Sequence, residues 1–447
     1  MVSTLRHTIL LVVLFCTISC GSVSDVSYLK KSGYALTPPS DVTIDFDEYV
    51  AQNKANIKAA MLNRQDPAVF QGNYDLEDAV DLRAPYSINI DSAVCPKGVA
   101  GEDKGFLLIH GLTDSPYLMK GLAQSLRKAY PCSIIRAIVL PGHSTIPGDA
   151  NHSKDWDDAN DHQLMTHKKW LESTNYGIRS FDKEEHVTSL YVLTFSTGAP
   201  LLINHVSKYE EPKLKGAVFI SAAVKAKSKA AFLAPVAQYL VPWSVVYPEE
   251  DAVRYETFST HAAAEFYWLT KDLLNDQYRF PLPLFVAISA DDNTVSAEAA
   301  LSYFCAAKTD NKKMIWYQYA KSEEPLDSFK LGRSACRDDI IEREIGKNGF
   351  ELPSYYKSFS HTALSVPESD PHYGINGAYR QCKNYFMDDK LDLFTQCKDP
   401  KEHNYLIGET TKRFYNDNKG KLIRRGVYNP DYPFMEKQIL SFIDSIN

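Results

Sequence analysis

Long apolar runs are missing from this sequence. The apolar stretch near the N-terminus covers only residues 9–15, whereas a helix that crosses a bilayer needs about 20 apolar residues. The sequence also lacks a stripe of Lys and Arg, an internal repeat, and the CxxC or Cys/His spacings that hold zinc. It therefore gives no indication of a nucleic-acid partner, a repeat architecture or a metal site.

The overall composition is that of a folded globular protein. Of 447 residues, 44% are hydrophobic and 23% are charged, and the net charge is -7. This balance argues against wholesale disorder. The length allows either two domains or one large domain with additions.

Residues 1–20 are typical of an export signal. Arg6 precedes the short apolar run, whose length suits a signal-peptide core. Ser19 directly precedes Cys20, and this pair resembles the lipobox of bacterial lipoproteins, whose cysteine is acylated, although Thr17 stands where Leu is usual. Plain cleavage nearby, for instance after Gly21, is the alternative. We expect either a lipoprotein held on a membrane through Cys20 or a periplasmic or secreted protein.

The remaining cysteines agree with export. Without Cys16 and Cys20, an even number is left, and disulfides form in oxidising compartments. Six cysteines allow 15 pairings, and six free thiols are a further alternative. Pairing between nearest neighbours would join Cys95 to Cys132, Cys305 to Cys336, and Cys382 to Cys397.

Short apolar runs alternate with helical stretches along most of the chain. Runs of this kind mark strands that are buried on both faces of a sheet. The alternation predicts a mostly parallel sheet with helices on both faces. The expected strands are 105–110, 133–140, 190–195, 216–221, 284–289 and 314–319.

The chain divides into an N-terminal part and one large unit. Residues 21–100 read as an arm and a helix that packs on the core, and 101–447 as the α/β unit. Two stretches interrupt the alternation: 223–281 is expected to be an inserted helical cap, and 320–357 a surface excursion. Residues 366–427 carry no motif that we can name.

The strongest local signal is the pentapeptide from Thr194 to Gly198, at a junction between a strand and a helix. It approximates the G-x-S-x-G nucleophile elbow, with Ser196 as the nucleophile and Thr194 in place of the first glycine. The structural alternative is a Ser/Thr-rich helix cap.

A second signal follows the strand at 105–110. The sequence from His110 and Gly111 to Ser115-Pro116 resembles the oxyanion loop of the α/β hydrolases, in the branch of carboxylesterases, monoacylglycerol lipases and serine aminopeptidases. The resemblance implies the α/β-hydrolase fold and an oxyanion held by the N–H groups of Leu112 and Thr197. Residues 140–143, Leu-Pro-Gly-His, are similar to a structural motif of the same branch.

The acid and the histidine of this family follow the serine in that order. Asp292 has the register of the family's acid, with Ala290 in place of a glycine; Asp291 is the runner-up, and an exposed acidic turn is the structural alternative. His361 lies in a segment that resembles the family's histidine loop. The spacings are 96 residues from Ser196 to Asp292 and 69 from Asp292 to His361.

The resemblance implies a serine hydrolase that cleaves carboxylic esters, namely a short or medium acyl ester, a monoacylglycerol or a lysolipid. It needs no cofactor, metal, nucleic acid or obligate protein partner. Two alternatives stay open: a serine aminopeptidase, and a catalytically silent surface lipoprotein that binds a ligand or partner, which the residues Thr194 and Ala290 favour.

Overall fold

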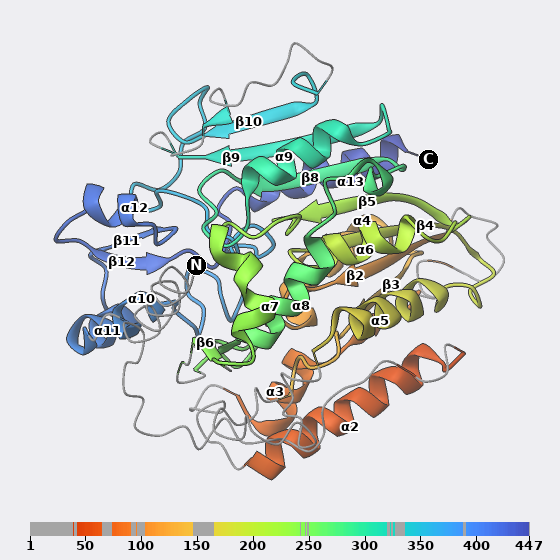
Figure 1. Cartoon of the computed structure of the whole chain (residues 1–447), viewed down its shortest axis with the longest axis horizontal. Helices are drawn as coiled ribbons and strands as arrows, with labels where there is room; N and C mark the ends of the chain where they lie inside the picture. The colour runs from red at the N-terminus through yellow and green to blue at the C-terminus, as the bar shows by residue number, and fades with distance from the viewer. Residues whose placement is uncertain are drawn as a thin grey trace, which may run out of the picture.

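An eight-stranded sheet forms the centre of the molecule (Figure 1). The computed structural model describes residues 39, 43–64, 74–90, 95, 103–145, 165–241, 243–245, 247, 250–319, 322, 325–326, 336–387 and 390–446. The strand order is β1-β3-β2-β4-β5-β8-β9-β10, and each neighbouring pair is parallel except β1 with β3. The strands are β1 (Tyr86–Ile88), β2 (Asp103–Ile109), β3 (Ile134–Ile138), β4 (Val187–Phe195), β5 (Leu214–Ile220), β8 (Leu284–Ser289), β9 (Lys312–Gln318) and β10 (Ile340–Glu344).

Helices cover both faces of this sheet because its strands are apolar on both sides. In β2, Leu107 and Ile109 pack into one core with α5, α6 and α9, whereas Phe106 and Leu108 pack into the other with α4 and α13. The expected parallel sheet between two helical layers is confirmed, and its strand order and the sharp turn after β4 are those of the α/β-hydrolase fold. The main helices are α2 (Phe46–Arg64), α3 (Leu76–Arg83), α4 (Lys120–Ala129), α5 (His167–Arg179), α6 (Gly198–Val206), α9 (Ala297–Ala306) and α13 (Tyr432–Ser445), and the 3₁₀ turn η3 (Pro116–Met119) precedes α4.

The chain between β5 and β8 leaves the sheet over residues 221–283, which we call the β5–β8 segment. Helices α7 and α8 pack against each other within it (Figure 1). This is the stretch in which the sequence predicts a helical cap. Its elements are η5 (Lys229–Leu233), α7 (Ala234–Ala237), β6 (Trp243–Val245), β7 (Phe258–Ser259), α8 (Thr260–Thr270) and η6 (Asp276–Tyr278).

Strand β10 lies within the stretch that was expected to be a surface excursion. Residues Ile340–Glu344 pair in parallel with β9 and extend the sheet by one strand. The strand is short, carries three charged residues and pairs on one side only, so its sequence lacks the apolar run of a central strand.

Residues 366–427, called the late segment below, form a compact addition beside the carboxyl ends of the strands (Figure 1). A parallel pair, β11 (Tyr405–Gly408) and β12 (Leu422–Arg425), lies at its centre. Three short helices accompany this pair: α10 (Lys383–Met387), α11 (Leu391–Lys398) and α12 (Lys412–Asp417). The sequence alone gave no motif here.

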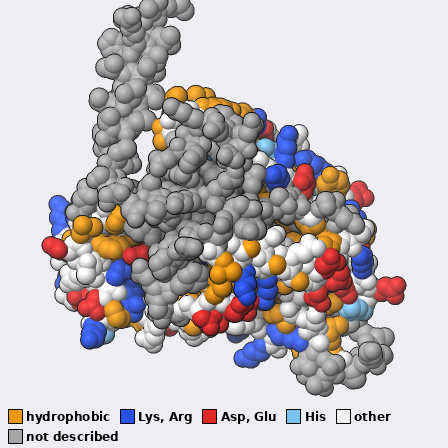
Figure 2. All heavy atoms as spheres, turned by 90° about the horizontal axis from the view of Figure 1, so that it is seen from below, with side chains coloured by type: hydrophobic (Ala, Val, Ile, Leu, Met, Phe, Trp, Pro, Cys, Tyr) orange, Lys and Arg blue, Asp and Glu red, His pale blue; other side chains and the backbone are white. Residues whose placement is uncertain are grey.

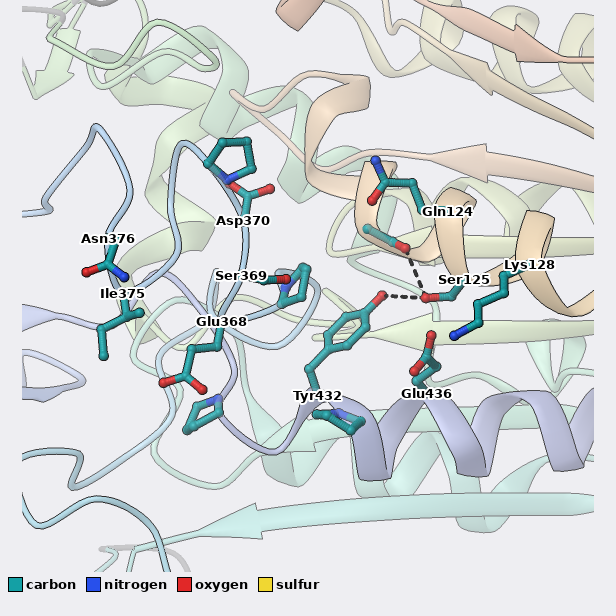
Figure 3. Close-up of a pocket in the computed structure, with 15 residues that line it drawn as sticks. Gln124, Ser125, Lys128, Glu368, Ser369, Asp370, Ile375, Asn376, Tyr432 and Glu436 are labelled. Atoms are coloured by element: carbon teal, nitrogen blue, oxygen red, sulfur yellow. Dashed lines mark hydrogen bonds between the residues drawn. The ribbon is translucent and has the colours of Figure 1, made fainter.

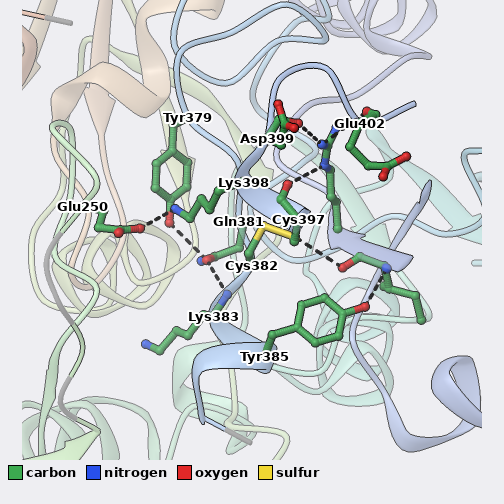
Figure 4. The surroundings of a disulfide bond; sticks show 12 residues. Glu250, Tyr379, Gln381, Cys382, Lys383, Tyr385, Cys397, Lys398, Asp399 and Glu402 are labelled. Carbon is green, nitrogen blue, oxygen red and sulfur yellow. Dashed lines mark hydrogen bonds and ion pairs between the residues drawn. A yellow bond between two sulfur atoms is a disulfide. The ribbon is translucent and has the colours of Figure 1, made fainter. Parts of the chain in front are cut away.

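Three disulfides join cysteines that are neighbours in the sequence. They are Cys95–Cys132, Cys305–Cys336 and Cys382–Cys397, which is the nearest-neighbour arrangement. The last bond ties α11 to the chain before α10 in the late segment. Beside it, Lys398 forms an ion pair at 2.6 Å with Glu250 of the β5–β8 segment (Figure 4).

The predictions about the N-terminus lie outside the described residues. These are the export signal over residues 1–20 and acylation of Cys20. Within the ranges that the structure describes, every helix is too short or too polar to span a membrane.

Candidate active site

Three side chains from distant parts of the sequence meet at the carboxyl ends of the strands. Ser196 follows β4, Asp292 follows β8, and His361 lies in the chain after β10. Ser196 Oγ is 2.9 Å from His361 Nε2, and His361 Nδ1 is 2.6 Å from Asp292 Oδ2. Because a carboxylate only accepts hydrogen bonds, Nδ1 carries the ring proton and Nε2 is left to accept from the Ser196 hydroxyl. This is the geometry of a nucleophile, a base and an orienting acid.

The turn that carries Ser196 is tight. Ser196 has a left-handed backbone conformation with φ of 51°, which is strained for a non-glycine residue and raises the hydroxyl above the sheet. A Cβ on Gly198 would lie 2.6 Å from the Ile109 carbonyl oxygen, so glycine is needed there. Thr194, which replaces the motif's first glycine, is buried, and its hydroxyl donates to the Val218 carbonyl at 3.4 Å. The turn therefore accommodates this departure from the motif.

Both carboxylate oxygens of Asp292 are engaged. Oδ1 accepts the backbone N–H groups of Thr294 at 2.7 Å and Val295 at 2.9 Å, while Oδ2 faces His361. The side chain is buried. Three hydrogen bonds thus fix the plane of the carboxylate and hold it ready to orient the imidazole.

Asp291, the alternative acid, points elsewhere. Its Oδ2 accepts the Tyr319 backbone N–H at 2.9 Å, beyond the end of β9. Burial raises the pKa of the Asp291 carboxyl to about 7, although hydrogen bonds from Ser322 and Tyr319 oppose the shift. The structure therefore brings Asp292, and not Asp291, to His361.

The loop after β2 packs directly against the serine. A Cβ on Gly111 would lie 2.8 Å from the Ser196 Cβ, so only glycine allows this approach. Thr113 has a φ of 67°, and its carbonyl accepts the Tyr255 backbone N–H at 2.8 Å. The β5–β8 segment, which contains Tyr255, thus supports the turn of this loop.

The two amides expected to bind an oxyanion are available. Among the described residues, neither the Leu112 N–H nor the Thr197 N–H has a hydrogen-bond acceptor. Thr197 is buried at the start of α6, and a buried amide without a partner is rare unless a ligand or water fills its place. These donors suit an oxygen that develops negative charge next to Ser196.

His110 holds the loop rather than facing the serine. Its Nε2 accepts the Leu140 N–H at 3.0 Å, and its Nδ1 lies 2.8 Å from the Gly111 carbonyl oxygen. Burial lowers the pKa of His110 well below its ordinary value, and the nearby His143 lowers it further. A neutral His110 therefore ties the loop to the chain that follows β3.

The loop after β2 also carries a buried carboxyl group, that of Asp114, which the sequence did not reveal as a site residue. Asp114 Oδ2 would be 2.6 Å from a Cβ on Gly111, so Asp114 and Ser196 flank this glycine. Within the described part of the chain, Asp114 Oδ1 has no hydrogen-bond partner, and the Arg254 Nη1 atom is 3.8 Å away. Burial raises the pKa of Asp114 to about 6, although the charge of Arg254 opposes the shift.

The late segment supplies an ion pair, Glu409 with Arg425, that contacts the backbone of His361 and that the sequence did not reveal. Glu409 Oε2 accepts the His361 backbone N–H at 3.3 Å. The same carboxylate accepts Arg425 Nε at 2.7 Å and Nη2 at 2.9 Å, and Arg425 Nη2 also donates to the Thr294 hydroxyl at 3.2 Å. One ion pair therefore contacts both the backbone of His361 and the loop that holds Asp292.

The three central side chains are almost closed off from solvent. Ser196 is 5% exposed, His361 is 4% exposed and Asp292 is 1% exposed.

Two hollows lie outside this cluster. One, of about 700 Å³, lies between α4, α13 and the start of the late segment (Figure 3). The other, of about 470 Å³, is lined by Asp292 and Glu409, but neither Ser196 nor His361 lines it. Over the described ranges, His, Cys, Asp and Glu form no group of three that could hold a metal ion.

The sequence matches no protein-family model and no curated protein. A metagenome-derived lipolytic enzyme, from a study of LipS and LipT, is 17% identical with a TM-score of 0.39, over 53% of this chain and 87% of that one. A monoacylglycerol lipase of Paleococcus ferrophilus is 15% identical with a TM-score of 0.39, over 52% and 88%. A soluble variant of monoglyceride lipase from Saccharomyces cerevisiae is 10% identical with a TM-score of 0.40, over 53% and 82%. Likenesses of this size carry no activity over to this chain.

Proposed function

We propose that the chain is a serine hydrolase that cleaves carboxylic esters, with Ser196 as nucleophile, His361 as base and Asp292 as the orienting acid. The proposal rests on one observation above all: two consecutive hydrogen bonds, of 2.9 and 2.6 Å, connect the three side chains on a strained turn. Their order along the chain, serine, acid and histidine, is the order required of this fold.

The chemistry follows from this arrangement. His361 Nε2 takes the proton of Ser196 as Oγ attacks the carbonyl carbon, and the N–H groups of Leu112 and Thr197 stabilise the oxyanion. The imidazolium, which Asp292 stabilises, gives the proton to the leaving alkoxide. A water molecule, deprotonated by His361, then cleaves the acyl-enzyme and regenerates the serine.

Ester substrates and export are the finer parts of the proposal. The preference for esters over peptides comes from the family resemblance of the His110–Pro116 loop, and an aminopeptidase remains the alternative. Export is supported by the three disulfides, because such bonds persist in oxidising compartments. Acylation of Cys20 stays a prediction from the sequence.

An active-site probe separates an enzyme from a silent relative. A fluorophosphonate should label the folded chain, and the label should disappear in Ser196→Ala. Folded protein that takes up no label would refute the hydrolase and favour the silent surface protein. A panel of p-nitrophenyl esters and aminoacyl anilides then decides between esterase and peptidase.

The acid has a matched control one residue away. Asp292→Asn should lower kcat by about 10⁴-fold, because the amide favours the wrong tautomer of the histidine. Asp291→Asn should keep most of the activity, since Asp291 binds the backbone of Tyr319 instead. The reverse result would move the acid to Asp291.

A further inference from the structure

Exposed apolar side chains gather on one short stretch of the β5–β8 segment. Five of the twelve large apolar side chains that are exposed in the described ranges fall between residues 232 and 240. Soluble surfaces normally scatter such side chains, and a cluster marks a contact site. The five, which are between 47% and 73% exposed, are Phe232, Leu233, Val236, Tyr239 and Leu240.

A tryptophan on the neighbouring helix extends the cluster. Trp268 is 42% exposed and lies on α8, which packs against both η5 and α7. The Lys271 ammonium group is 4.6 Å from the centre of the Trp268 ring. Tryptophan and tyrosine with lysine nearby are the side chains that favour the boundary between water and lipid.

The same stretch is basic, although the chain as a whole is acidic. Residues 221–248 contain three lysines and no Asp or Glu, whereas the net charge of the protein is -7. Lys229 is exposed just before the apolar cluster, and Lys225 is exposed a few residues earlier, where the chain pairs with residues 294–296. Over much of the coloured surface in Figure 2, by contrast, basic and acidic side chains lie among one another.

This combination selects one kind of occupant. The core of a protein interface is depleted in lysine, whereas a membrane with anionic headgroups attracts lysines and accepts apolar side chains below them. Residues 221–248 themselves include no acidic side chain that such a surface would repel.

We propose that residues 225–240, called the basic apolar face, dock the protein on a lipid surface that carries anionic headgroups. Phe232, Leu233, Val236, Tyr239 and Leu240 enter the boundary of the acyl chains, and Lys225 and Lys229 contact the headgroups. This inference does not depend on the proposed catalysis.

Sedimentation with vesicles tests the proposal. The full chain is made with Cys20→Ala, so that no acyl group holds it on the membrane, and is mixed with phosphatidylcholine vesicles with or without phosphatidylglycerol. We expect at least tenfold tighter binding when phosphatidylglycerol is present. All variants share residues 9–15, so any contribution of that apolar run to vesicle binding cancels when the variants are compared.

Two pairs of variants probe the two components. Val236→Ser with Leu240→Ser should weaken binding at least tenfold, because two exposed apolar side chains are lost from the contact. Lys225→Gln with Lys229→Gln should weaken binding about tenfold on phosphatidylglycerol vesicles and leave binding to phosphatidylcholine unchanged. All four positions are at the surface, so folding is expected to be retained.

Matched controls lie on α2. Leu62→Ser removes an apolar side chain that is 57% exposed. Lys54→Gln with Lys58→Gln removes two lysines whose side chains are 42% exposed and paired with Asp81 and Glu77. Neither change should alter binding. If the α2 variants lost as much vesicle binding as the variants of the basic apolar face, the proposal would be overturned. It would also be overturned by binding that ignores phosphatidylglycerol, or by a dimer in analytical ultracentrifugation that Val236→Ser with Leu240→Ser dissociates.

Catalysis and docking can fail separately. Ser196→Ala should bind vesicles as tightly as the parent while it loses the fluorophosphonate label. A chain that takes up the label but does not bind phosphatidylglycerol vesicles retains the proposed function and refutes the docking face.

Discussion

The basic apolar face and the late segment are opposites in how they use their side chains. The face turns apolar groups and lysines outward, and residues 221–248 around it include no Asp or Glu. The late segment turns polar and charged groups inward. The inward side chains include His372, Tyr373, Tyr379, Glu409 and Arg425, which contact the β5–β8 segment or the chain around His361 and Asp292.

The difference shows where each region finds its partners. Polar groups that are buried need hydrogen bonds inside the molecule, so the late segment is bound to what it covers. Exposed apolar groups cost a folded protein little. Their burial lowers the free energy only when another molecule or a membrane covers them. Substitutions in the late segment and its contacts should therefore change stability or catalysis, whereas substitutions in the face should change binding.

The largest effect is expected where the late segment is joined to the β5–β8 segment. Asp251 accepts hydrogen bonds from His372 Nε2 at 2.9 Å, the Tyr373 hydroxyl at 2.8 Å and Arg254 Nε at 3.1 Å. Asp251→Asn leaves the buried Arg254 without its nearest counter-charge. We expect the free energy of unfolding in urea to fall by about 3–5 kcal/mol.

An exposed aspartate of the same segment is the control for this substitution. Asp276 is paired with Arg279, but its side chain is 83% exposed. Asp276→Asn should change the free energy of unfolding by less than about 0.5 kcal/mol. If Asp251→Asn lowered the free energy of unfolding as little as Asp276→Asn, the inward polar contacts of the late segment would not stabilise the protein, and the contrast with the basic apolar face would fail.

The second prediction concerns pH and Asp114, which faces the same arginine. Burial raises the pKa of Asp114 from its ordinary 3.8 to about 6, so the folded chain binds this proton more tightly than the unfolded chain. The ionised carboxylate therefore lowers stability above the folded pKa, and this cost is relieved as the pH falls from about 6 towards 3.8. Asp114→Asn removes this dependence.

Urea unfolding of the parent and of Asp114→Asn at two pH values checks the direction in which their difference in stability changes with pH. The stability of Asp114→Asn relative to the parent should fall by roughly 2 kcal/mol from about pH 8 to about pH 4.5. Asp251 should behave in the opposite way: burial would raise its pKa, but His372, Arg254 and the Val253 N–H together outweigh burial and hold the pKa below its ordinary value. Its contribution is therefore present above the unfolded pKa and is lost as the pH falls through the folded pKa. A relative stability of Asp114→Asn that does not change with pH would contradict this assignment.

The sequence predicts the sheet where burial leaves a local pattern. Strands such as β2 and β8 are apolar on both faces, and short apolar runs identify them. Strand β10 escapes this reasoning because it pairs on one side and is mostly charged. The late segment escapes it because its contacts join residues that are far apart in the chain, such as His372 and Asp251.

The residues of the candidate site also fall into two groups, those that a local sequence motif identifies and those that only the fold brings together. Ser196, Asp292 and His361 each lie in a short motif, because a tight turn or a fixed loop needs particular neighbours. Glu409 and Arg254 have no such motif, since a buried charge needs only a partner in space. Arg254 faces Asp114, and Glu409 faces the backbone of His361; a single sequence does not encode either distance.

The smallest effect is expected where the late segment contacts the histidine. Glu409→Gln keeps the shape of the side chain but removes the charge that faces Arg425, and it leaves fewer acceptors for the His361 N–H. The loop of His361 should then be held less firmly, which we expect to lower kcat about tenfold, or about 1.4 kcal/mol. KM should change less than twofold, because Glu409 contacts the backbone of His361 and not the N–H groups of Leu112 and Thr197.

A double-mutant cycle tells positioning from general destabilisation. Glu409→Gln leaves the Arg425 charge unpaired, so adding Arg425→Gln should restore part of kcat if the pair acts as a unit. Glu409→Asp, which keeps the charge on a shorter side chain, should lie between the parent and Glu409→Gln. With Arg425→Gln alone to complete the cycle, ester hydrolysis measured over a range of substrate concentrations gives kcat and KM separately for all five proteins. Additive losses in the cycle, or a KM that rises as kcat falls, would mean that the late segment supports the fold in general and not the histidine in particular.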